Sequence, residues 1–297
     1  MIINKNSRIL VQGITGKEGL RATKDMIDYG SNVICGVTPG KGGTIVLDIP
    51  VFDSVAEAVR FNKEINVSVL YVPPLLVYDA VIEALYNGIK TIIIITENVP
   101  IKDVAKILEL SEKYDAIIIG PSSVGVIKVG ECKVGSIGGS NVGRYFLKGK
   151  VGIVSKSGGM SAETSLLLSQ NGIGQSIVVG IGGELISCST FCDMLKMFEK
   201  DIDTKVIVLF GEIGGNSEEK AAEMIKKGEI KKPVVAFVSG KFAQTINRSV
   251  ALGHGGAIIE RGMGGAESKI IALRDAGVRV ANFHHEIVDL VREVLKE

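Results

Sequence analysis

Short runs of apolar, mostly β-branched residues recur along the chain, and each is followed by a turn and a segment with helical periodicity. Ile92–Ile95 is one such run and Val206–Phe210 is another. Because these runs are continuous rather than alternating, they are typical of strands buried on both faces. One strand and one helix recur about every 30 residues, which indicates βαβ units rather than a solenoid. The sequence therefore predicts parallel sheets with helices on both sides.

The repeating pattern is interrupted once, and the interruption suggests two domains. A chain of 297 residues is long enough for two domains that each bury a core. We expect a Rossmann-like domain at residues 1–125, a glycine-rich connection at 126–149 and a flavodoxin-like parallel α/β domain at 150–297. Helical periodicity and turn residues predict, among others, the helices Glu18–Tyr29, Ile101–Tyr114, Met160–Gln170 and Ser217–Lys227.

Charge and cysteine content exclude several classes of function. The chain has 34 Lys and Arg against 33 Asp and Glu, so we expect neither a nucleic-acid surface nor a polybasic membrane anchor. There is no secretory signal pattern and no apolar run long enough to span a bilayer. Cys188 and Cys192 lack the CxxC spacing of a zinc or redox site, so no metal site is expected. These features predict a cytoplasmic protein that acts on small molecules and binds protein partners.

Two glycine-bearing turns follow the first two expected strands. Gly13–Gly19 opens the first helix, where backbone amides can hold a phosphate, although its GxxGxxG spacing departs from the GxGxxG fingerprint. A plain strand-to-helix turn is the alternative. In the second turn, Thr38–Gly43, Lys41 occupies the place where NAD enzymes carry an acid. A cation there favours a ligand with an extra phosphate, such as coenzyme A or NADP, unless Lys41 is simply solvated.

Two further turns follow strands of the expected second domain. Small residues from Ser155 to Met160 leave amides free at a helix start, where an anion can dock, or the serines are ordinary N-caps. Glu212, within Gly211–Gly215, places a carboxylate at the carboxyl end of a strand, where open α/β sheets gather their ligands.

His254 is the one histidine of the chain that is flanked by glycines, in Gly253–Ala257. Its small neighbours leave either ring nitrogen open to a phosphate, a metal or another subunit. His284 and His285 lie instead in an amphipathic C-terminal segment. We therefore expect any covalent chemistry on a histidine to use His254, with Glu212 holding its imidazole N–H and fixing its tautomer.

Seven segments, in this order along nearly the whole chain, resemble the α subunit of succinyl-CoA synthetase, within the superfamily of ADP-forming acyl-CoA synthetases and ATP citrate lyase. They are Gly13–Gly19, Gly36–Gly43, Thr96–Glu97, Gly130–Gly135, Gly180–Gly183, Gly211–Gly215 and Gly253–Ile259. The resemblance implies a CoA-binding domain followed by a ligase domain whose histidine is transiently phosphorylated.

By the same resemblance, each site residue has an expected role in an acid–thiol ligase that reversibly makes succinyl-CoA. His254 would be the phosphohistidine and Glu212 would orient it. An acyl phosphate would form and the CoA thiol would capture the acyl group, so that one hard condensation is split into easier steps. The residues expected to line the CoA site are Thr15, Gly16, Lys17, Glu18, Lys41, Ile95, Thr96 and Glu97, and those expected near phosphate and substrate are Ser155, Ser157, Gly158, Gly159 and Ala162.

The chain has no Walker A sequence and no acidic cluster suited to Mg-ATP. The resemblance implies that ATP or GTP with Mg²⁺ is bound mainly by a separate β subunit with an ATP-grasp fold, in an αβ or α2β2 heteromer. This chain should therefore be inactive alone.

The sequence departs from the succinate pattern where the acid would bind. Gly120–Gly125 stands in place of GPNCPG, and Ser157–Glu163 in place of SGTLTYE, so that Ala162 replaces a tyrosine. These two stretches look more like those of ATP citrate lyase and citryl-CoA synthetase, and a smaller residue at 162 suits a larger acid. Glu184, in contrast, is a poor match for a tricarboxylate. Succinate is the expected acid, and the small subunit of a citryl-CoA synthetase, or of another acid–CoA ligase, is the alternative.

Two other classes of function are alternatives. A non-catalytic CoA- or NAD-binding regulatory module needs only the first domain, so the full second domain with His254 speaks against it. An NADP-dependent oxidoreductase would need a hydride-accepting site and a general acid, and the sequence shows neither.

Overall fold

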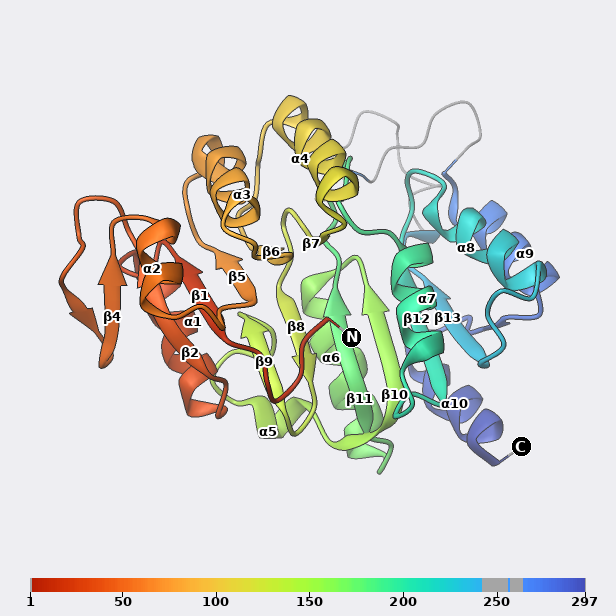
Figure 1. Ribbon diagram of the computed structural model, residues 1–297. Helices are drawn as coiled ribbons and strands as arrows, with labels where there is room; N and C mark the ends of the chain where they lie inside the picture. Colours follow the sequence, from red (N-terminus) through yellow and green to blue (C-terminus); the bar gives the residue numbers. More distant parts are fainter. Residues whose placement is uncertain (1, 242–255, 257–263, 297) are drawn as a thin grey trace. The chain divides into compact units, whose positions relative to one another are not determined.

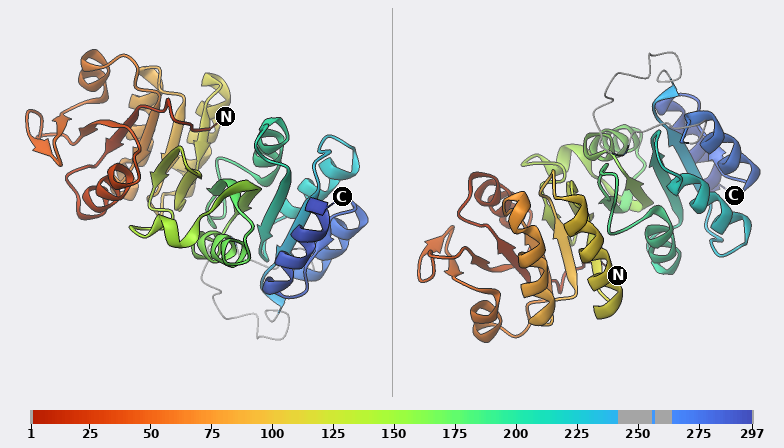
Figure 2. Two further views of the ribbon diagram at one scale, coloured as in Figure 1. Left: turned by 90° about the horizontal axis from the view of Figure 1, so that it is seen from below. Right: turned by 90° about the horizontal axis from the view of Figure 1, so that it is seen from above.

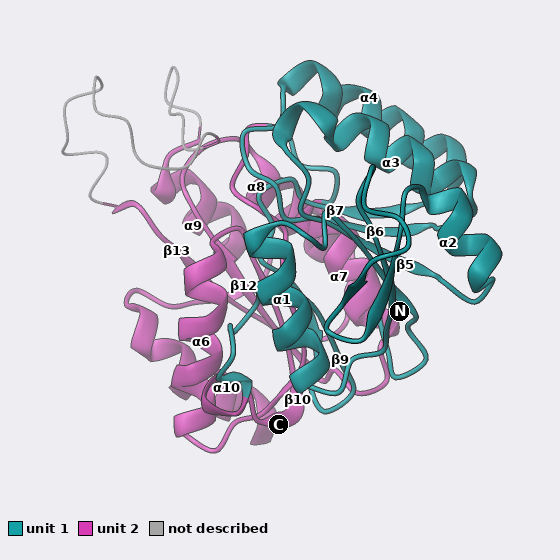
Figure 3. Ribbon diagram, turned by 90° about the vertical axis from the view of Figure 1, so that its left-hand side faces the viewer, with its two compact units in different colours: residues 1–142, 186–189 teal, residues 143–185, 190–297 magenta. Residues whose placement is uncertain are grey.

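The structure, a computed structural model, describes residues 2–241, 256 and 264–296 as two compact units (Figures 1 and 3). Unit 1 comprises Met1–Val142 and Ile186–Ser189, and unit 2 comprises Gly143–Leu185 and Thr190–Glu297. Ile186–Ser189 joins unit 1 beside its last parallel strand, because the Cys188 N–H donates to the Gly120 carbonyl at 2.9 Å.

The sheet of unit 1 has the strand order β3-β4-β2-β1-β5-β6-β7, and all neighbours are parallel except the antiparallel pair β3 and β4. The parallel strands β4-β2-β1-β5-β6-β7 have the order 3-2-1-4-5-6 in the chain, which is the Rossmann order and confirms the expected fold class of the first domain. Its strands are β1 (Ile9–Gln12), β2 (Val33–Val37), β3 (Ile45–Val46), β4 (Ile49–Phe52), β5 (Val67–Leu70), β6 (Thr91–Ile94) and β7 (Ile117–Ile119).

Helices cover both faces of this sheet. Right-handed crossovers run from β1 to β2 in one direction and from β5 to β7 in the other, which places their helices on opposite faces. Accordingly α2, α3 and α4 pack side by side, while α1 lies on the other face (Figure 3). The helices are α1 (Lys17–Asp28), α2 (Val55–Phe61), the 3₁₀ turn η1 (Pro74–Leu76), α3 (Val77–Tyr86) and α4 (Ile101–Tyr114).

The segment expected as a glycine-rich connection contains regular structure. β8 (Gly125–Lys128) and β9 (Cys132–Gly135) form an antiparallel hairpin, and α5 (Val142–Tyr145) follows. The hairpin packs on α1, and the hydroxyl of Ser31, in the turn after α1, donates to the Lys133 carbonyl at 2.8 Å. The strands of this hairpin are short and lie among many glycines, so the sequence pattern does not reveal them.

The parallel strands of unit 2 run in the order β14-β13-β12-β10-β11. In chain order this is 2-1-3-4-5, the flavodoxin-like order, which confirms the fold class expected for the second domain. These strands are β10 (Lys148–Ser155), β11 (Gln175–Gly180), β12 (Val206–Gly211), β13 (Val234–Val238) and β14 (Arg279–Val280).

The helices of unit 2 form two layers. One layer holds α6 and α10, which contact each other, and the other holds α7, α8 and α9 in a row (Figures 1 and 2). The sheet between them is buried throughout its centre, where every residue of β11 and β12 is buried. The helices are α6 (Gly158–Gln170), α7 (Phe191–Lys200), α8 (Ser217–Lys226), α9 (Ala266–Asp275) and α10 (Ile287–Lys296), with the 3₁₀ turn η3 (His284–Glu286) before α10.

A capping residue lengthens one helix beyond the bounds that the sequence pattern predicts. The sequence predicts a helix from Met160, but α6 begins at Gly158 because the Ser157 hydroxyl accepts the Met160 N–H at 3.4 Å. None of the helices in the described part of the chain is long and apolar enough to cross a membrane.

Truncation of a strand residue in the core of unit 1 should destabilise the protein. Ile93, in the middle of β6, is fully buried, so Ile93→Ala removes apolar contacts and leaves a cavity. We expect a loss of about 2–5 kcal/mol in the free energy of unfolding, measured by urea denaturation. The control is Ile45→Ala, because Ile45 is 72% exposed in the same unit. Equal losses in the two variants would contradict the buried position of β6.

Candidate functional site

The residues expected to bind coenzyme A lie in loops at one edge of the unit 1 sheet. β1, β2, β5 and β6 are parallel, so the loops that follow them all emerge at their carboxyl ends. The structure thereby brings together residues that are far apart in the sequence. After β1 come Thr15, Gly16, Lys17 and Glu18, after β2 comes Lys41, and after β6 come Ile95, Thr96 and Glu97.

The turn after β1 is built for close backbone approach. A Cβ atom on Gly13 would lie 2.7 Å from the Tyr71 carbonyl oxygen, and a Cβ on Gly19 would collide with the Gly13 carbonyl. Gly16 is the N-cap of α1 and provides no side-chain hydrogen bond to the first helical turn. The N–H groups at the start of α1 are therefore left without a side-chain cap, as an anion site at a helix amino terminus requires.

Side-chain hydrogen bonds tie the neighbouring loops of this edge together. The hydroxyls of Thr15 and Thr38 are 3.2 Å apart, which joins the loops after β1 and β2. The Thr96 hydroxyl donates to the Val72 carbonyl at 2.7 Å, which joins the loops after β6 and β5. Lys41 is exposed, so its ammonium can turn towards a ligand phosphate.

In unit 2 two of the expected site turns lie next to each other. β10 pairs with both β11 and β12, so the strand order reverses at β10, and a crevice for ligands is typical of such a point. The turn after β10 begins at Ser155, and the loop Gly211–Gly215 begins at the end of β12. The structure therefore places these two turns at neighbouring strand ends.

The serines of the first turn already have partners within the chain. The buried Ser155 hydroxyl donates to the Ser157 carbonyl at 2.7 Å. Ser157 is the N-cap of α6, which was the alternative interpretation of this turn. Gly158 and Gly159 form the first turn of α6, and Ala162 is half-buried one turn further on.

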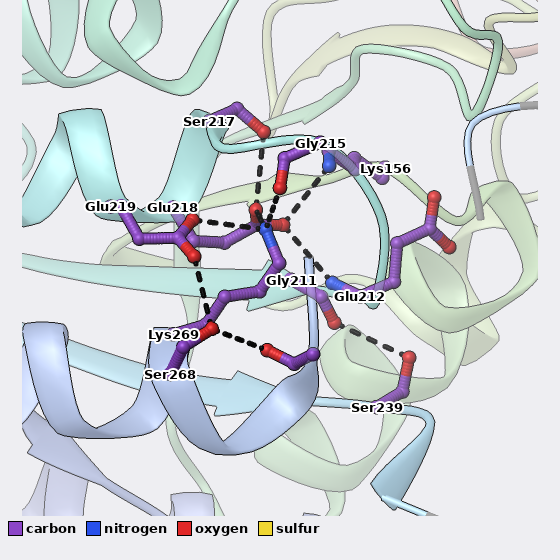
Figure 4. A network of polar contacts seen from close by, with 11 residues as sticks. Lys156, Gly211, Glu212, Gly215, Ser217, Glu218, Glu219, Ser239, Ser268 and Lys269 are labelled. Atoms are coloured by element: carbon purple, nitrogen blue, oxygen red, sulfur yellow. Dashed lines mark hydrogen bonds and ion pairs between the residues drawn. The ribbon is translucent and has the colours of Figure 1, made fainter. Parts of the chain in front are cut away.

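The second loop rests on a cluster of buried charges (Figure 4). The Glu218 side chain, at the start of α8, is fully buried, and its Oε1 accepts the Glu212 backbone N–H and lies 3.1 Å from Lys156 Nζ. The Lys269 ammonium, from α9, donates to the other carboxylate oxygen of Glu218 and to the Gly215 carbonyl, the latter at 3.0 Å. The Glu212 carboxylate points away from this cluster (Figure 4). We call Lys156, Glu218 and Lys269 the lysine–glutamate cluster.

The cluster keeps Glu218 ionised. Burial by itself opposes ionisation, but the ammoniums of Lys156 and Lys269, together with the hydrogen bonds from Lys269 and from the Glu212 N–H, hold the pKa of Glu218 below its usual value. Glu219 lies 3.1 Å from Lys269 at the outer side of the cluster, with 28% of its side chain exposed. Two ammoniums thus face two carboxylates.

Sequence reasoning missed the lysine–glutamate cluster, although a signal for it exists. Glu218 shares a helical stripe with Ala221 and Ala222, and all three are buried. Lys269 lies in the stripe of Ala266 and Leu273 in the same way. A charged residue within an apolar stripe on each of two helices indicates a buried ion pair, once the helices are known to pack together.

The expected phosphohistidine, His254, lies outside the described residues. Gly256 is the described residue nearest to it in the sequence, and its N–H donates to the Gly183 carbonyl at 3.0 Å. A Cβ atom on Gly256 would lie 3.0 Å from the Glu184 carbonyl oxygen, so the two backbones are in close contact. Gly183 and Glu184 belong to the loop after β11, the strand that pairs with β10.

His284 is half-buried in unit 2, whereas its neighbour His285 is exposed. The Nε2 atom of His284 lies 2.9 Å from the Thr164 hydroxyl, and its ring meets Phe210 and Phe237 edge-on. Burial lowers the pKa of His284, and this effect exceeds the opposing influence of Glu163. His284 is thus a packed, neutral side chain rather than an open nucleophile.

The described residues contain no group of three or more His, Cys, Asp or Glu side chains that could hold a metal ion. All four cysteines of the chain are free thiols. Burial raises the pKa of the Cys35 and Cys188 thiols to about 12, which makes both unreactive near neutral pH.

Comparison with known families gives matches to both units. The model of the CoA binding domain matches residues 4–98, and that of the CoA-ligase matches residues 154–279. The chain is 45% identical to the succinate–CoA ligase [ADP-forming] subunit alpha 1 of Archaeoglobus fulgidus, over 100% of this chain and 98% of that protein. It is 42% identical to the succinate–CoA ligase [ADP-forming] subunit alpha of Staphylococcus aureus (strain N315), over 100% and 95%.

Solved structures of similar fold belong to larger chains. The ATP citrate lyase of Methanosaeta concilii, in complex with (3S)-citryl-CoA, is similar with a TM-score of 0.92 and 27% identity. The match covers 100% of this chain and 50% of the lyase chain, so this chain spans half of the lyase's length. The dinucleotide forming acetyl-coenzyme A synthetase 1 of Ca. Korarchaeum cryptofilum shares the fold, with a TM-score of 0.77 at 18% identity over 97% of this chain and 60% of that one.

The lowered pKa of His284 predicts a loss of stability in acid. The unfolded chain takes up a proton on this histidine near pH 6.5, whereas the folded chain does so only at lower pH. The stability that the neutral His284 contributes is therefore fully present above about pH 6.5. It is lost as the pH falls through the pKa of His284 in the folded state. Urea denaturation at about pH 7.5 and 5.5 should show a smaller pH effect in His284→Asn than in the wild type. An equal effect in both proteins would contradict the assignment.

Proposed function

Because the chain belongs to the succinate–CoA ligase α-subunit family, we propose that it is the α subunit of an ADP- or GDP-forming acid–CoA ligase that reversibly makes succinyl-CoA. The observation that carries this proposal is the full-length similarity to the archaeal α subunit. A non-catalytic binding module and an NADP-dependent oxidoreductase are set aside, because the second half of the chain matches the CoA-ligase model.

Coenzyme A is the cofactor of unit 1, and the first turn fits its phosphates. Gly16 leaves the start of α1 without a side-chain cap, and the close packing around Gly13 keeps the turn narrow. We assign the ligand contacts to Thr15, Gly16, Lys17, Glu18, Lys41, Ile95, Thr96 and Glu97, which lie at one edge of the sheet. When bound, the cofactor supplies the thiol that accepts the acyl group.

His254 would carry the phosphoryl group between nucleotide and acid. As a nucleophile it takes the group from the nucleotide and gives it to the succinate carboxylate, so that an acyl phosphate forms. The contact of Gly256 with Gly183 supports this choice, because Gly256 follows His254 by two residues in the sequence and lies at the carboxyl edge of the unit 2 sheet. The N–H groups at the start of α6, at Gly158 and Gly159, would stabilise the phosphate charge.

Glu212 would orient the imidazole of His254. It stands at the carboxyl end of β12, beside the turn that holds Ser155 and Ser157. A carboxylate that accepts one imidazole N–H fixes the tautomer, which leaves the other nitrogen free to attack phosphorus. The orientation of its carboxylate away from the lysine–glutamate cluster supports this role (Figure 4).

An α subunit implies a partner subunit. We propose a β subunit with an ATP-grasp fold that binds ATP or GTP with Mg²⁺, in an αβ or α2β2 heteromer. This chain has no Walker A sequence, which agrees with a nucleotide bound elsewhere. We also propose a cytoplasmic setting, in keeping with four free cysteines.

A larger acid is the second candidate for the substrate. Ala162 stands on α6 where the succinate pattern has a tyrosine, and a smaller side chain there would suit a larger acid. The similar lyase structure contains citryl-CoA. A citryl-CoA synthetase small subunit is therefore the alternative to a succinate–CoA ligase.

The chain should become labelled on His254 when it is mixed with its β subunit, Mg²⁺ and γ-labelled ATP. We expect acid-labile, base-stable phosphate in the wild type and none in His254→Asn, because asparagine has no nucleophilic ring nitrogen. Calorimetric CoA binding should be unchanged in the variant, since the assigned contacts lie in unit 1. Absence of label in the wild type with either ATP or GTP would overturn the proposal.

The choice of acid should appear in a substrate panel. CoA-dependent ADP release is measured with succinate, citrate, malate and monocarboxylic acids at equal concentration. We expect succinate to give the highest kcat/KM, and Ala162→Tyr to preserve this preference while lowering activity on larger acids. Citrate as the best substrate would replace succinate by the alternative acid, and failure of every acid would contradict both.

A further inference from the structure

The loop that carries Glu212 is bound at both of its ends, directly or through a lysine, to the carboxylate of Glu218. Glu218 Oε1 accepts the Glu212 N–H at 3.1 Å, at the start of the loop. The Lys269 ammonium donates to both the Glu218 carboxylate and the Gly215 carbonyl. Glu218 is thereby also connected to the end of the loop. We propose that Glu218 is a positioning residue of the ligase reaction, which sets the place of Glu212 relative to the turn after β10. The inference rests on the proposed function.

The glycines of this loop are explained by the path of the Glu218 side chain. A Cβ atom on Gly211 would lie 2.8 Å from Glu218 Cγ and 3.0 Å from its Oε1. Any larger residue at 211 would therefore push the carboxylate away from the Glu212 N–H. Gly214 and Gly215 have positive φ angles of 94° and 58°, which turn the chain back so that the Gly215 carbonyl meets Lys269.

Glu218 also connects this loop with the neighbouring turn. Lys156 stands between Ser155 and Ser157, and its ammonium lies 3.1 Å from Glu218 Oε1. The Lys156 backbone N–H donates to the carbonyl of Phe210, the residue before the loop, at 3.4 Å. Through these contacts the turn after β10 and the loop after β12, which lie where the strand order reverses, are both bound to the same carboxylate.

The lysine–glutamate cluster makes a backbone hydrogen bond that an ion pair with a purely structural role would not need. A buried pair that serves stability alone can be exchanged for apolar side chains of similar size with little loss. Here the carboxylate also accepts a backbone N–H from the loop that carries Glu212, and no apolar side chain can replace that hydrogen bond. A positioning role therefore predicts a loss of activity where a structural role predicts none.

The decisive variant is Glu218→Gln, assayed in the heteromer with the β subunit. The neutral amide keeps the size of the side chain but has a single acceptor oxygen, whereas Lys269 contacts Oε2 of Glu218 and both Lys156 and the Glu212 N–H contact Oε1. If the oxygen faces Lys269, the NH₂ group faces the Glu212 N–H, and if the oxygen faces Glu212, the NH₂ group faces the Lys269 ammonium that holds the Gly215 carbonyl. Two donors then face each other and the loop shifts. We expect kcat to fall about 100-fold, as for a displacement of about 1 Å at a catalytic group, while the KM for CoA stays unchanged.

Glu219→Gln is the matched control. Glu219 is adjacent on α8 and lies 3.1 Å from the same Lys269 ammonium, so the variant removes the same charge from the same helix. Its kcat should stay within about threefold of the wild type. Equal loss in the two glutamine variants would mean that the charge balance matters and the contact to Glu212 does not, which would overturn the inference.

A double variant keeps the test decisive if Glu218→Gln is unstable. Glu218→Leu with Lys269→Met replaces the fully buried pair by apolar side chains, and Lys156 can turn to water because its side chain is partly exposed. Circular dichroism should show a folded protein that binds CoA normally, yet its His254 should be labelled about 100-fold more slowly in rapid-quench assays with labelled ATP. A folded double variant that is labelled at the wild-type rate would overturn the inference.

Failure of the inference and failure of the proposed function give different results. If the wild-type heteromer makes succinyl-CoA and labels His254 but the Glu218 variants do so equally well, the positioning role alone is wrong. If the wild type does neither, the proposed function fails, and the positioning role fails with it.

Discussion

Burial of the strands on both faces decides where polar chemistry can stand in this protein. Every residue of β11 and β12 is buried, and so is every residue of β1 and β5, because helices cover both sides of each sheet. A polar group within such a strand must find a hydrogen-bond partner inside the protein. The assigned functional residues accordingly lie at the carboxyl ends of the strands, in the loops that follow them and at the starts of α1 and α6, where parallel pairing brings several loops to one edge.

The helices that begin at the carboxyl edge of the sheet are capped differently in the two units. In unit 1 the N-cap of α1 is Gly16, which leaves the first N–H groups without a side-chain partner. In unit 2 the Ser157 hydroxyl already accepts one N–H of α6. The first turn thus suits a ligand that supplies its own anionic oxygens, whereas the second is a partly closed turn whose remaining amides can stabilise a charge that forms only during transfer.

The lysine–glutamate cluster shows how unit 2 tolerates charge in its interior. The side chains of Glu218 and Lys269 are fully buried, and either of them alone would carry an uncompensated charge. Together with Lys156 they satisfy one another and also accept or donate to the backbone of the Gly211–Gly215 loop. Acidic residues in the first turn of α8 are further favoured by the helix dipole.

Local sequence determined most of the fold and the turns proposed for the site. The helix at Ile101–Tyr114 is predicted at its observed bounds, and the apolar run Val206–Phe210 lies within β12, because periodicity and turn residues specify both within a short stretch. The glycine turns after β1 and β12 were recognised in the same way. The hairpins β3–β4 and β8–β9 were missed, since Leu47 and Asp48 make a tight turn with positive φ and the strands are too short to show a period.

Only the tertiary structure decided which side chains meet at that site. Glu218 and Lys269 are 51 residues apart, and they become partners because α8 packs on α9 in the layer of helices over the sheet. The Ile186–Ser189 segment joins unit 1 through hydrogen bonds to residues that precede it by about 70 positions, a contact that no local pattern encodes. The sequence by itself determined most of the elements, the family resemblance and the loops of the candidate site. Long-range packing decided the buried charges beneath Glu212, because their pairing depends on distances between helices that are remote in the chain.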